Sequence, residues 1–215
     1  MIVASAISKI FGMKSGKVLI AALAASIMGA LPTVAGPEQI TVSLGSKATQ
    51  PPLGWVEFCA NQPNECVGAA TKSSDVVLSR DAWMDLVRVN KRVNATIKPL
   101  TDLEHWGVVE HWSYPDDGYG DCEDYVLLKR KMLIQSGWPR EALLITVVLD
   151  NKHQGHAVLM VTTKQGDFIL DNQKTEILLW SETGYRFIKR QSRSNHNEWV
   201  SMNSPQPATA TAASR

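Results

Sequence analysis

The sequence predicts a single α+β domain, in which helices from the first half of the chain pack against an antiparallel sheet formed by the second half. The chain has 215 residues, enough for one domain of about 100 to 200 residues with short extensions. Hydrophobic residues make up 44% of it, a fraction typical of a folded protein. Apolar residues first recur at helical spacing and later form short β-branched runs. Helices followed by strands are typical of the α+β class.

The first 35 residues have the order of charges and small residues that is typical of a secretory signal. Three lysines precede an uncharged run over residues 18–35, in which small side chains accumulate towards Ala35. A membrane anchor is the alternative, but the run is short, rich in alanine, and contains glycine and proline. We expect export and cleavage after Ala35, with Ala30 as a second possible site. The folded domain would then occupy residues 36–200, followed by a low-complexity disordered tail over residues 201–215.

Charge and cysteine content narrow the class of protein. The 22 basic and 21 acidic side chains nearly balance, so no basic surplus predicts binding to nucleic acid. Cys59 and Cys66 lie in FCANQPNEC with six residues between them, and an exported chain can form disulfides. We predict that they pair, with a contribution of about 2 kcal/mol from restricting the unfolded chain. A zinc site is the alternative, but no further CxxC motif or nearby histidine pair supplies its other ligands.

The first long helix is predicted over residues 79–94, followed by a loop. Its apolar residues recur at helical spacing, and Ser79 is placed to cap its N-terminus. The spaced apolar residues are Trp83, Leu86, Val89 and Val93. Residues 99–120 contain several aromatic side chains, glycines and prolines, including Trp106 and Trp112. We interpret them as a loop packed by aromatic side chains, with a substrate groove as a second role for the two tryptophans.

A second helix is predicted over residues 121–136. Asp121 can cap it, acidic residues fill its first turn, and Gly137 with Pro139 ends it. Its predicted buried stripe consists of Tyr125, Leu128 and Met132.

The second half of the chain contains short apolar or β-branched runs that are separated by Gly, Asn, Asp and Lys. We predict antiparallel strands there, with residues 185–190 as an additional candidate. The predicted strands are Ala142 to Leu149, Ala157 to Thr163, Phe168 to Leu170 and Glu176 to Trp180.

Cys122 is the cysteine left unpaired, and its position suggests chemistry. It lies in the first turn of the second predicted helix, where exposed backbone N–H groups and the helix dipole favour an anion. A thiolate is the nucleophilic form of cysteine. A free cysteine is also commonly a small buried hydrophobe, so position alone leaves both interpretations open.

A base and an orienting acid for this thiol are predicted further along the chain. His156 begins one predicted strand and Asp171 ends the next. In a hairpin with a two-residue turn, paired residues have numbers with an odd sum, so these two side chains share a face. A turn at residues 165–166 would offset them, whereas a turn at 163–164 would set them opposite. If close, they would complete the Cys-His-Asp arrangement of acyl transfer. His153 is a competing base, but it lies in a polar stretch before the strand.

Four segments carry a resemblance to a known family. GDCEDYVLLKR, the downstream GHAVL, the later LDNQ and the upstream FCANQPNEC resemble the bacterial transglutaminase-like cysteine proteinases, a family that includes periplasmic proteases of the LapG type. The resemblance extends from about Trp55 to about Lys189. It implies a papain-like, transglutaminase-like fold in which Cys122 is the nucleophile, His156 the base and Asp171 the orienting acid.

The acidic residues around the thiol need an explanation. Asp121, Glu123 and Asp124 flank Cys122, and such close carboxylates oppose thiolate formation by like-charge repulsion. A bound cation would reverse the effect, and Ca²⁺ prefers several oxygen ligands. The resemblance implies a calcium requirement, with these three carboxylates as ligands. Simple helix capping is the alternative, and Asp116 with Asp117 is either part of the site or a solvated turn.

The resemblance also implies a function. We expect a periplasmic, calcium-dependent cysteine endopeptidase that cuts the N-terminal region of a large surface adhesin and so affects biofilm attachment. It implies a possible partner as well, an inner-membrane receptor for a cyclic dinucleotide that sequesters the protease. Two alternatives remain at this point. One is a transglutaminase-type acyltransferase with the same three residues, and the other is a noncatalytic calcium-binding interaction module with an inert Cys122.

Overall fold

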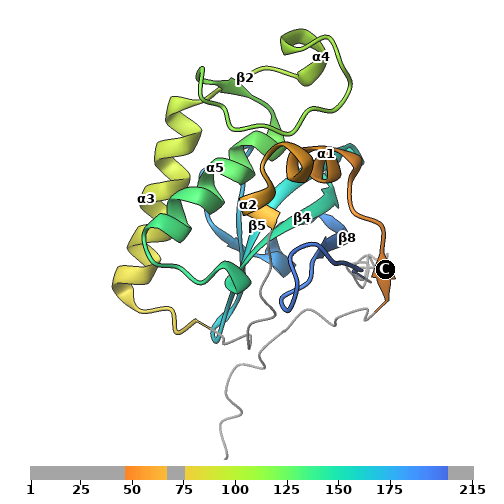
Figure 1. Cartoon of the computed structure of the whole chain (residues 1–215). Helices are drawn as coiled ribbons and strands as arrows, with labels where there is room; N and C mark the ends of the chain where they lie inside the picture. The colour runs from red at the N-terminus through yellow and green to blue at the C-terminus, as the bar shows by residue number, and fades with distance from the viewer. Residues whose placement is uncertain (1–46, 67–75, 203–215) are drawn as a thin grey trace, which may run out of the picture. The chain divides into compact units, whose positions relative to one another are not determined.

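The computed structural model describes residues 47–66 and 76–202 (Figure 1). The predicted secretory signal over residues 1–35 lies outside the described residues, as does all but the first two residues of the predicted tail. Among the helices of the described segments, none combines the length and the apolar character needed to cross a membrane.

A seven-stranded antiparallel sheet forms the centre of the described region and confirms the predicted α+β class. The strand order is β1-β9-β8-β4-β5-β6-β7, so that β4 and β5 lie in the middle. The strands are β1 (Ala48–Thr49), β4 (Leu143–Leu149), β5 (Gly155–Thr163), β6 (Gly166–Leu170), β7 (Leu178–Leu179), β8 (Arg186–Gln191) and β9 (Trp199–Ser201).

The central strands are largely apolar because both faces of the sheet are covered. Along β4, Leu143 and Ile145 belong to the core beneath the helices, whereas Leu144 and Val148 belong to a second core on the opposite face. All four side chains are fully buried. A continuous apolar run, rather than a strict alternation with polar residues, is therefore the pattern that this sheet requires.

Two long helices run side by side in front of the sheet (Figure 1). These are α3 (Arg80–Thr96) and α5 (Cys122–Gln135). At the start of α3, the Ser79 hydroxyl accepts a hydrogen bond from the Ala82 N–H at 3.1 Å, as the predicted cap requires. The shorter helices α1 (Leu53–Asn61) and α2 (Pro63–Cys66) precede them.

The residues of α5 that are buried differ from the predicted buried stripe. Tyr125 is buried, but Leu128 and Met132 are only half-buried, while the charged side chains of Lys129 and Arg130 are fully buried. The stripe was wrong because α5 is enclosed on several sides, by α3 on one and by the sheet on another. A helix that is buried nearly all round has no narrow apolar face to recognise.

Several short elements also differ from the sequence expectations. The predicted loop over residues 99–120 contains helix α4 (Asp102–His105) and strand β3 (Tyr119–Gly120), and β3 pairs in parallel with β2 (Lys98–Pro99). The strand predicted over 176–180 shrinks to β7 because a 3₁₀ turn, Trp180–Glu182, follows it. A second 3₁₀ turn, Arg140–Ala142, precedes β4. Strands β1 and β9 were missed, and Ser201 belongs to β9 rather than to the tail.

The β5–β6 hairpin has a register between the two that the sequence suggested. Thr163 pairs with Gly166 and Leu159 with Leu170, so the two-residue turn is at residues 164–165. The odd sum of paired numbers holds, and it places His156 and Asp171 on one face with a two-residue offset along the strands.

Candidate active site

The thiol of Cys122 lies at the start of α5, next to the beginning of β5. Asp121 takes the N-cap position with an extended backbone, but its side chain makes no capping hydrogen bond, unlike the sequence prediction. The half-buried Cys122 Sγ accepts a hydrogen bond from the Ala157 N–H at 3.4 Å and donates one to Glu123 Oε2 at 3.1 Å. Because Ala157 directly follows His156 in β5, this contact places the thiol next to the strand that carries His156.

His156 and Asp171 form a buried pair. Their side chains are each only 2% exposed, and His156 Nε2 lies 2.9 Å from Asp171 Oδ1. Because the hairpin offset between them is two residues, the long imidazole bridges a gap that directly paired side chains would not have. Nε2 is engaged by Asp171, and the other ring nitrogen, Nδ1, has a long contact of 3.4 Å with Gln173 Nε2.

The carboxylate of Asp171 receives two further hydrogen bonds. The Gln173 backbone N–H donates to Oδ1 at 2.9 Å, and the Tyr185 hydroxyl donates to Oδ2 at 2.6 Å. Burial by itself raises the pKa of Asp171, but the hydrogen bonds and the nearby His156 outweigh it and keep the pKa below the usual value. Asp171 is therefore held as an anion in a buried position. Sequence reasoning did not assign a role to Gln173, although it stands in the LDNQ segment two residues after Asp171. It missed Tyr185 because no pattern marks a residue that reaches a carboxylate through the fold.

A cleft of about 440 Å³ opens in front of the thiol. Cys122 and His156 both line it, so a substrate bound there would meet the nucleophile and the proposed base together. Trp112 forms part of its wall and packs tightly against Gly54, where an added Cβ would meet the indole ring at 2.2 Å. The other lining residues are Pro52, Leu53, Glu110, Glu123, Val147, Gly155, Ala157 and Lys189.

The competing residues from the sequence lie elsewhere. His153 is exposed in the turn before β5 and has a positive φ of 63°. Trp106 is about half exposed and stacks on His105, which in turn lies 2.8 Å from Asp117 Oδ2. These residues form a local surface cluster, so Trp112 is the tryptophan of the predicted pair that reaches the cleft.

Carboxylates beside the thiol gather into two overlapping groups. Asp121 lies with Cys122 and Glu123 in one, and with Asp102 and Asp124 in the other, with potential ligand atoms within 4.8 Å of one another in each group. Within the described residues, Asp121 Oδ1 and Asp124 Oδ2 are buried without a hydrogen-bond partner. Asp102 was not among the predicted ligands, because 19 residues separate it from Asp121 and the parallel pairing of β2 with β3 is what joins their segments.

Burial and mutual repulsion perturb the titration of this cluster. Burial, followed by the neighbouring Asp121, raises the pKa of Glu123 to about 10. Burial also raises the pKa of Asp124 to about 8, against a lowering hydrogen bond from the Ser113 N–H. For Cys122, burial and the charge of Glu123 raise the pKa of the thiol well above its usual value. In the absence of a cation, burial and mutual repulsion therefore favour the protonated forms of Glu123 and Asp124 and disfavour the thiolate of Cys122.

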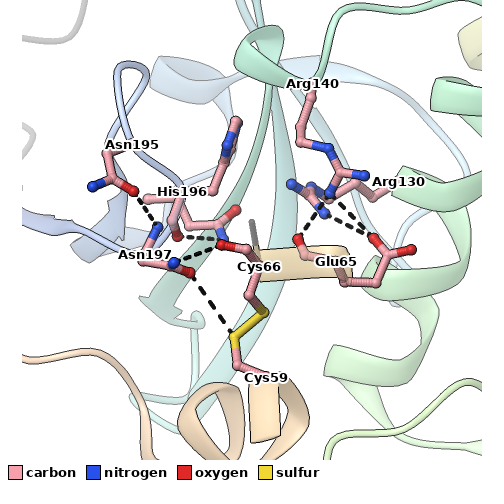
Figure 2. Close-up of a disulfide and its surroundings, with 9 residues drawn as sticks. Cys59, Glu65, Cys66, Arg130, Arg140, Asn195, His196 and Asn197 are labelled. Atoms are coloured by element: carbon pink, nitrogen blue, oxygen red, sulfur yellow. Dashed lines mark hydrogen bonds and ion pairs between the residues drawn. A yellow bond between two sulfur atoms is a disulfide. The ribbon is translucent and has the colours of Figure 1, made fainter. Parts of the chain in front are cut away.

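Cys59 of α1 and Cys66 of α2 are joined by a disulfide, with an S–S distance of 1.97 Å (Figure 2). The Asn197 side-chain amide donates to the Cys66 carbonyl, which ties the bridge to the loop before β9. Next to it, Glu65 lies between the guanidinium groups of Arg130 and Arg140, at 3.7 Å and 3.1 Å (Figure 2). These contacts fasten α2 to α5 and to the β8–β9 loop.

Comparisons with known proteins identify the family. Residues 45–207 match the family model described as bacterial transglutaminase-like cysteine proteinase BTLCP. A search of the curated proteins found no match.

Similar solved structures include LapG from Legionella pneumophila in three forms. The first is 26% identical, with coverage of 55% of this chain and 68% of LapG and a TM-score of 0.47. An EGTA-treated form is 28% identical, with coverage of 55% and 66% and a TM-score of 0.47. A calcium-bound form is 25% identical, with coverage of 60% and 75% and a TM-score of 0.48.

The match to the family model extends over more than half of the sequence and includes the thiol, the His156–Asp171 pair and the cleft. The chain therefore belongs to the bacterial transglutaminase-like cysteine proteinase family and is a cysteine peptidase.

Proposed function

We propose that the protein is an endopeptidase that hydrolyses peptide bonds through a thioester at Cys122, with His156 as the general base and Asp171 as its orienting acid. One observation carries the proposal: the free thiol opens onto the same cleft as an imidazole that is held by a buried carboxylate at 2.9 Å. A thiol, an imidazole on the same cleft and a carboxylate that holds the imidazole are the three groups that nucleophilic acyl transfer needs.

In the proposed reaction, the Cys122 sulfur attacks the carbonyl carbon of the scissile bond while His156 accepts the thiol proton. The imidazolium then gives that proton to the leaving amine, which departs as the C-N bond breaks and the thioester forms. Water, deprotonated by the same imidazole, hydrolyses the thioester and restores the thiol. Asp171 stabilises the imidazolium in both halves and keeps the ring in one tautomer.

We further propose a calcium site formed by Asp102, Asp121 and Asp124, with Glu123 beside Asp121. Support comes from the clustered oxygen atoms, two of them buried without a partner among the described residues, and from the raised pKa values of Asp124 and Glu123. Hard oxygen ligands suit Ca²⁺. A bound cation would supply positive charge next to the thiol. The ionised carboxylates would then no longer oppose the thiolate as strongly.

We propose that the chain acts in the periplasm after removal of residues 1–35. The lysine-bearing leader and the disulfide pair support export. As a cysteine peptidase it acts on a protein substrate. The resemblance of GDCEDY and GHAVL to LapG-type proteases supports a surface adhesin as that substrate, with an effect on biofilm attachment, and a cyclic-dinucleotide receptor in the inner membrane as its regulator.

The experiment that tests the activity is turnover of a peptide with a di-alanine site by the purified protein, with calcium and with chelator. We expect cleavage with calcium, and loss of it in Cys122→Ala and His156→Ala. His153→Ala is the matched control, because this exposed histidine lies three residues before His156 and should retain activity. Cleavage by Cys122→Ala would overturn the nucleophile assignment, and equal losses in the two histidine variants would overturn the assignment of the base.

Two further assays separate the alternative functions. Incorporation of a labelled primary amine into a glutamine donor, without hydrolysis, would indicate an acyltransferase. A thiol that iodoacetamide does not alkylate, with or without chelator, would indicate a noncatalytic module.

A further inference from the structure

We propose that Tyr185 is a positioning residue of the peptidase: its hydroxyl fixes the Asp171 carboxylate in the orientation that accepts the His156 Nε2 proton. The inference rests on the proposed function, because it assigns a role within the Cys122-His156-Asp171 site.

The two oxygens of Asp171 are held differently. Oδ1 accepts hydrogen bonds from His156 Nε2 and from the Gln173 N–H, both at 2.9 Å. Oδ2 accepts from the Tyr185 hydroxyl at 2.6 Å. A carboxylate that is held at one oxygen can still rotate about its Cβ–Cγ bond, whereas a donor on the second oxygen fixes its plane. A hydrogen bond to a charged group is also among the stronger ones in proteins. Tyr185 therefore completes the orientation of the acid.

Tyr185 is itself held in place before any substrate binds. Its backbone N–H donates to Thr183 Oγ1 at 3.1 Å, and the Thr183 hydroxyl donates to the Trp180 carbonyl at 2.8 Å. The ring stands edge-on to the His156 imidazole, with centroids 5.9 Å apart and an interplanar angle of 84°. Lys174 Nζ lies over the ring at 4.5 Å and donates to the Thr183 carbonyl. The phenol thus contacts both members of the buried pair.

The surroundings of Tyr185 keep its hydroxyl protonated, so that it can donate a hydrogen bond. Burial, together with the hydrogen bond to Asp171 and the charges of Asp171 and Asp150, raises the pKa of Tyr185 above its usual value. Lys129 on α5 interacts electrostatically with Asp171 from the helical side, and Lys174 lies on the Tyr185 ring. Tyr185 stays protonated across the neutral range and donates in every step of the reaction.

Tyr185→Phe removes the hydroxyl and keeps the ring. The buried Oδ2 then loses its donor, and the carboxylate no longer has a fixed plane for the Nε2 proton. We expect kcat to fall about tenfold with KM unchanged, because the defect affects the charged imidazolium that forms during the reaction rather than the cleft.

Tyr125→Phe is a matched control. Tyr125 is also buried, and its hydroxyl donates to the Ile97 carbonyl at 2.7 Å, so both variants lose one buried phenol hydrogen bond. Both should lower the melting temperature. The readout that separates them is the NMR signal of the His156 Nε2 proton in ¹⁵N-histidine-labelled protein, assigned by its loss in His156→Ala. We expect this signal to broaden or disappear through faster exchange with water in Tyr185→Phe and to persist in Tyr125→Phe.

An unchanged Nε2 signal in folded Tyr185→Phe would overturn the inference, as would an equal change in Tyr125→Phe. If Tyr185→Phe does not fold, 3-fluorotyrosine at position 185 keeps every contact and makes the phenol more acidic. It should shift the Nε2 resonance, whereas 3-fluorotyrosine at position 125 should not, and the opposite result would overturn the inference. The NMR readout needs no substrate. A Tyr185 effect without peptide cleavage would therefore leave the inference standing and contradict the proposed function alone.

Discussion

Replacement of Lys129 by methionine should stabilise the folded protein, and the gain should disappear as the pH rises. Lys129 is fully buried in the middle of α5, and its ammonium nitrogen has no hydrogen-bond partner among the residues that the structure describes. Its Nζ lies 5.9 Å from the centre of the Tyr125 ring. Burial lowers the pKa of Lys129 from 10.5 to about 7, and the charge of Asp171 offsets only part of this. Folding below pH 7 must therefore bury an ammonium group.

The sign and size of the effect follow from proton linkage. Below pH 7, Lys129 is charged in both the folded and the unfolded states, and the full cost of its burial is present. Between pH 7 and about 10.5 the unfolded chain binds the proton and the folded protein does not, so stability rises with pH. A pKa difference of about 3.5 units corresponds to at most about 5 kcal/mol, at about 1.36 kcal/mol per unit. Methionine retains the packing of the aliphatic stem and avoids this cost.

Urea unfolding at pH 6, 8 and 10, with the disulfide intact, measures the effect. We expect the free energy of unfolding of Lys129→Met to exceed that of the wild type by several kcal/mol at pH 6, by less at pH 8, and by little at pH 10. Lys131→Met is the control on the same helix, since Lys131 is half-buried and its Nζ lies over the Tyr114 ring at 3.9 Å. It should show no gain in stability at pH 6. The reasoning is refuted if Lys129→Met is less stable than the wild type at pH 6, or if its gain is the same at all three values.

Three further predictions concern the cation cluster, the cleft and the disulfide. Because the pKa of Asp124 is raised from 3.8 to about 8, the chelated protein should lose stability as the pH rises from about 4 to 8. Asp124→Asn should reduce both this loss and the increase in melting temperature on adding calcium. An equal calcium-induced increase in melting temperature in Asp124→Asn and the wild type would contradict the site. Gly54→Ala should displace the Trp112 indole and lower kcat/KM at least about tenfold, and unchanged peptide turnover would show that this wall does not contact substrate. The double replacement of Cys59 and Cys66 by serine should lower the free energy of unfolding by about 2 kcal/mol in urea titrations, and no loss would contradict the loop-entropy argument.

The sequence predicted the parts of the fold that depend on local patterns. Apolar periodicity and the Ser79 cap locate α3, and β-branched runs locate the central strands. Strand β9 escaped prediction because it has only three residues, which become a strand by pairing with β8 and with β1, and β1 is distant in sequence. A buried charge such as Lys129 escaped for a similar reason, since its helical surroundings are set by tertiary packing rather than by its neighbours in the chain.

In the site, too, the features that follow local sequence patterns were predicted and those that depend on tertiary packing were not. Cys122 was located as the unpaired cysteine at a helix start, and the parity of hairpin pairing put His156 and Asp171 on one face. The register itself depended on which two residues form the turn, and several adjacent pairs within residues 163–166 are compatible with one. Asp102 and Tyr185 reach the site only through the fold, so no spacing in the sequence indicates them.

The central claim is that peptide hydrolysis proceeds through a thioester on Cys122. The most direct test is to mix the protein with a cleavable peptide and calcium, quench in acid within the first turnover, and measure the intact mass. The account predicts an added mass equal to the N-terminal fragment of the peptide less one water, located at Cys122 by tandem mass spectrometry and absent in Cys122→Ala. An adduct on another residue, or peptide cleavage that continues in Cys122→Ala, would contradict it.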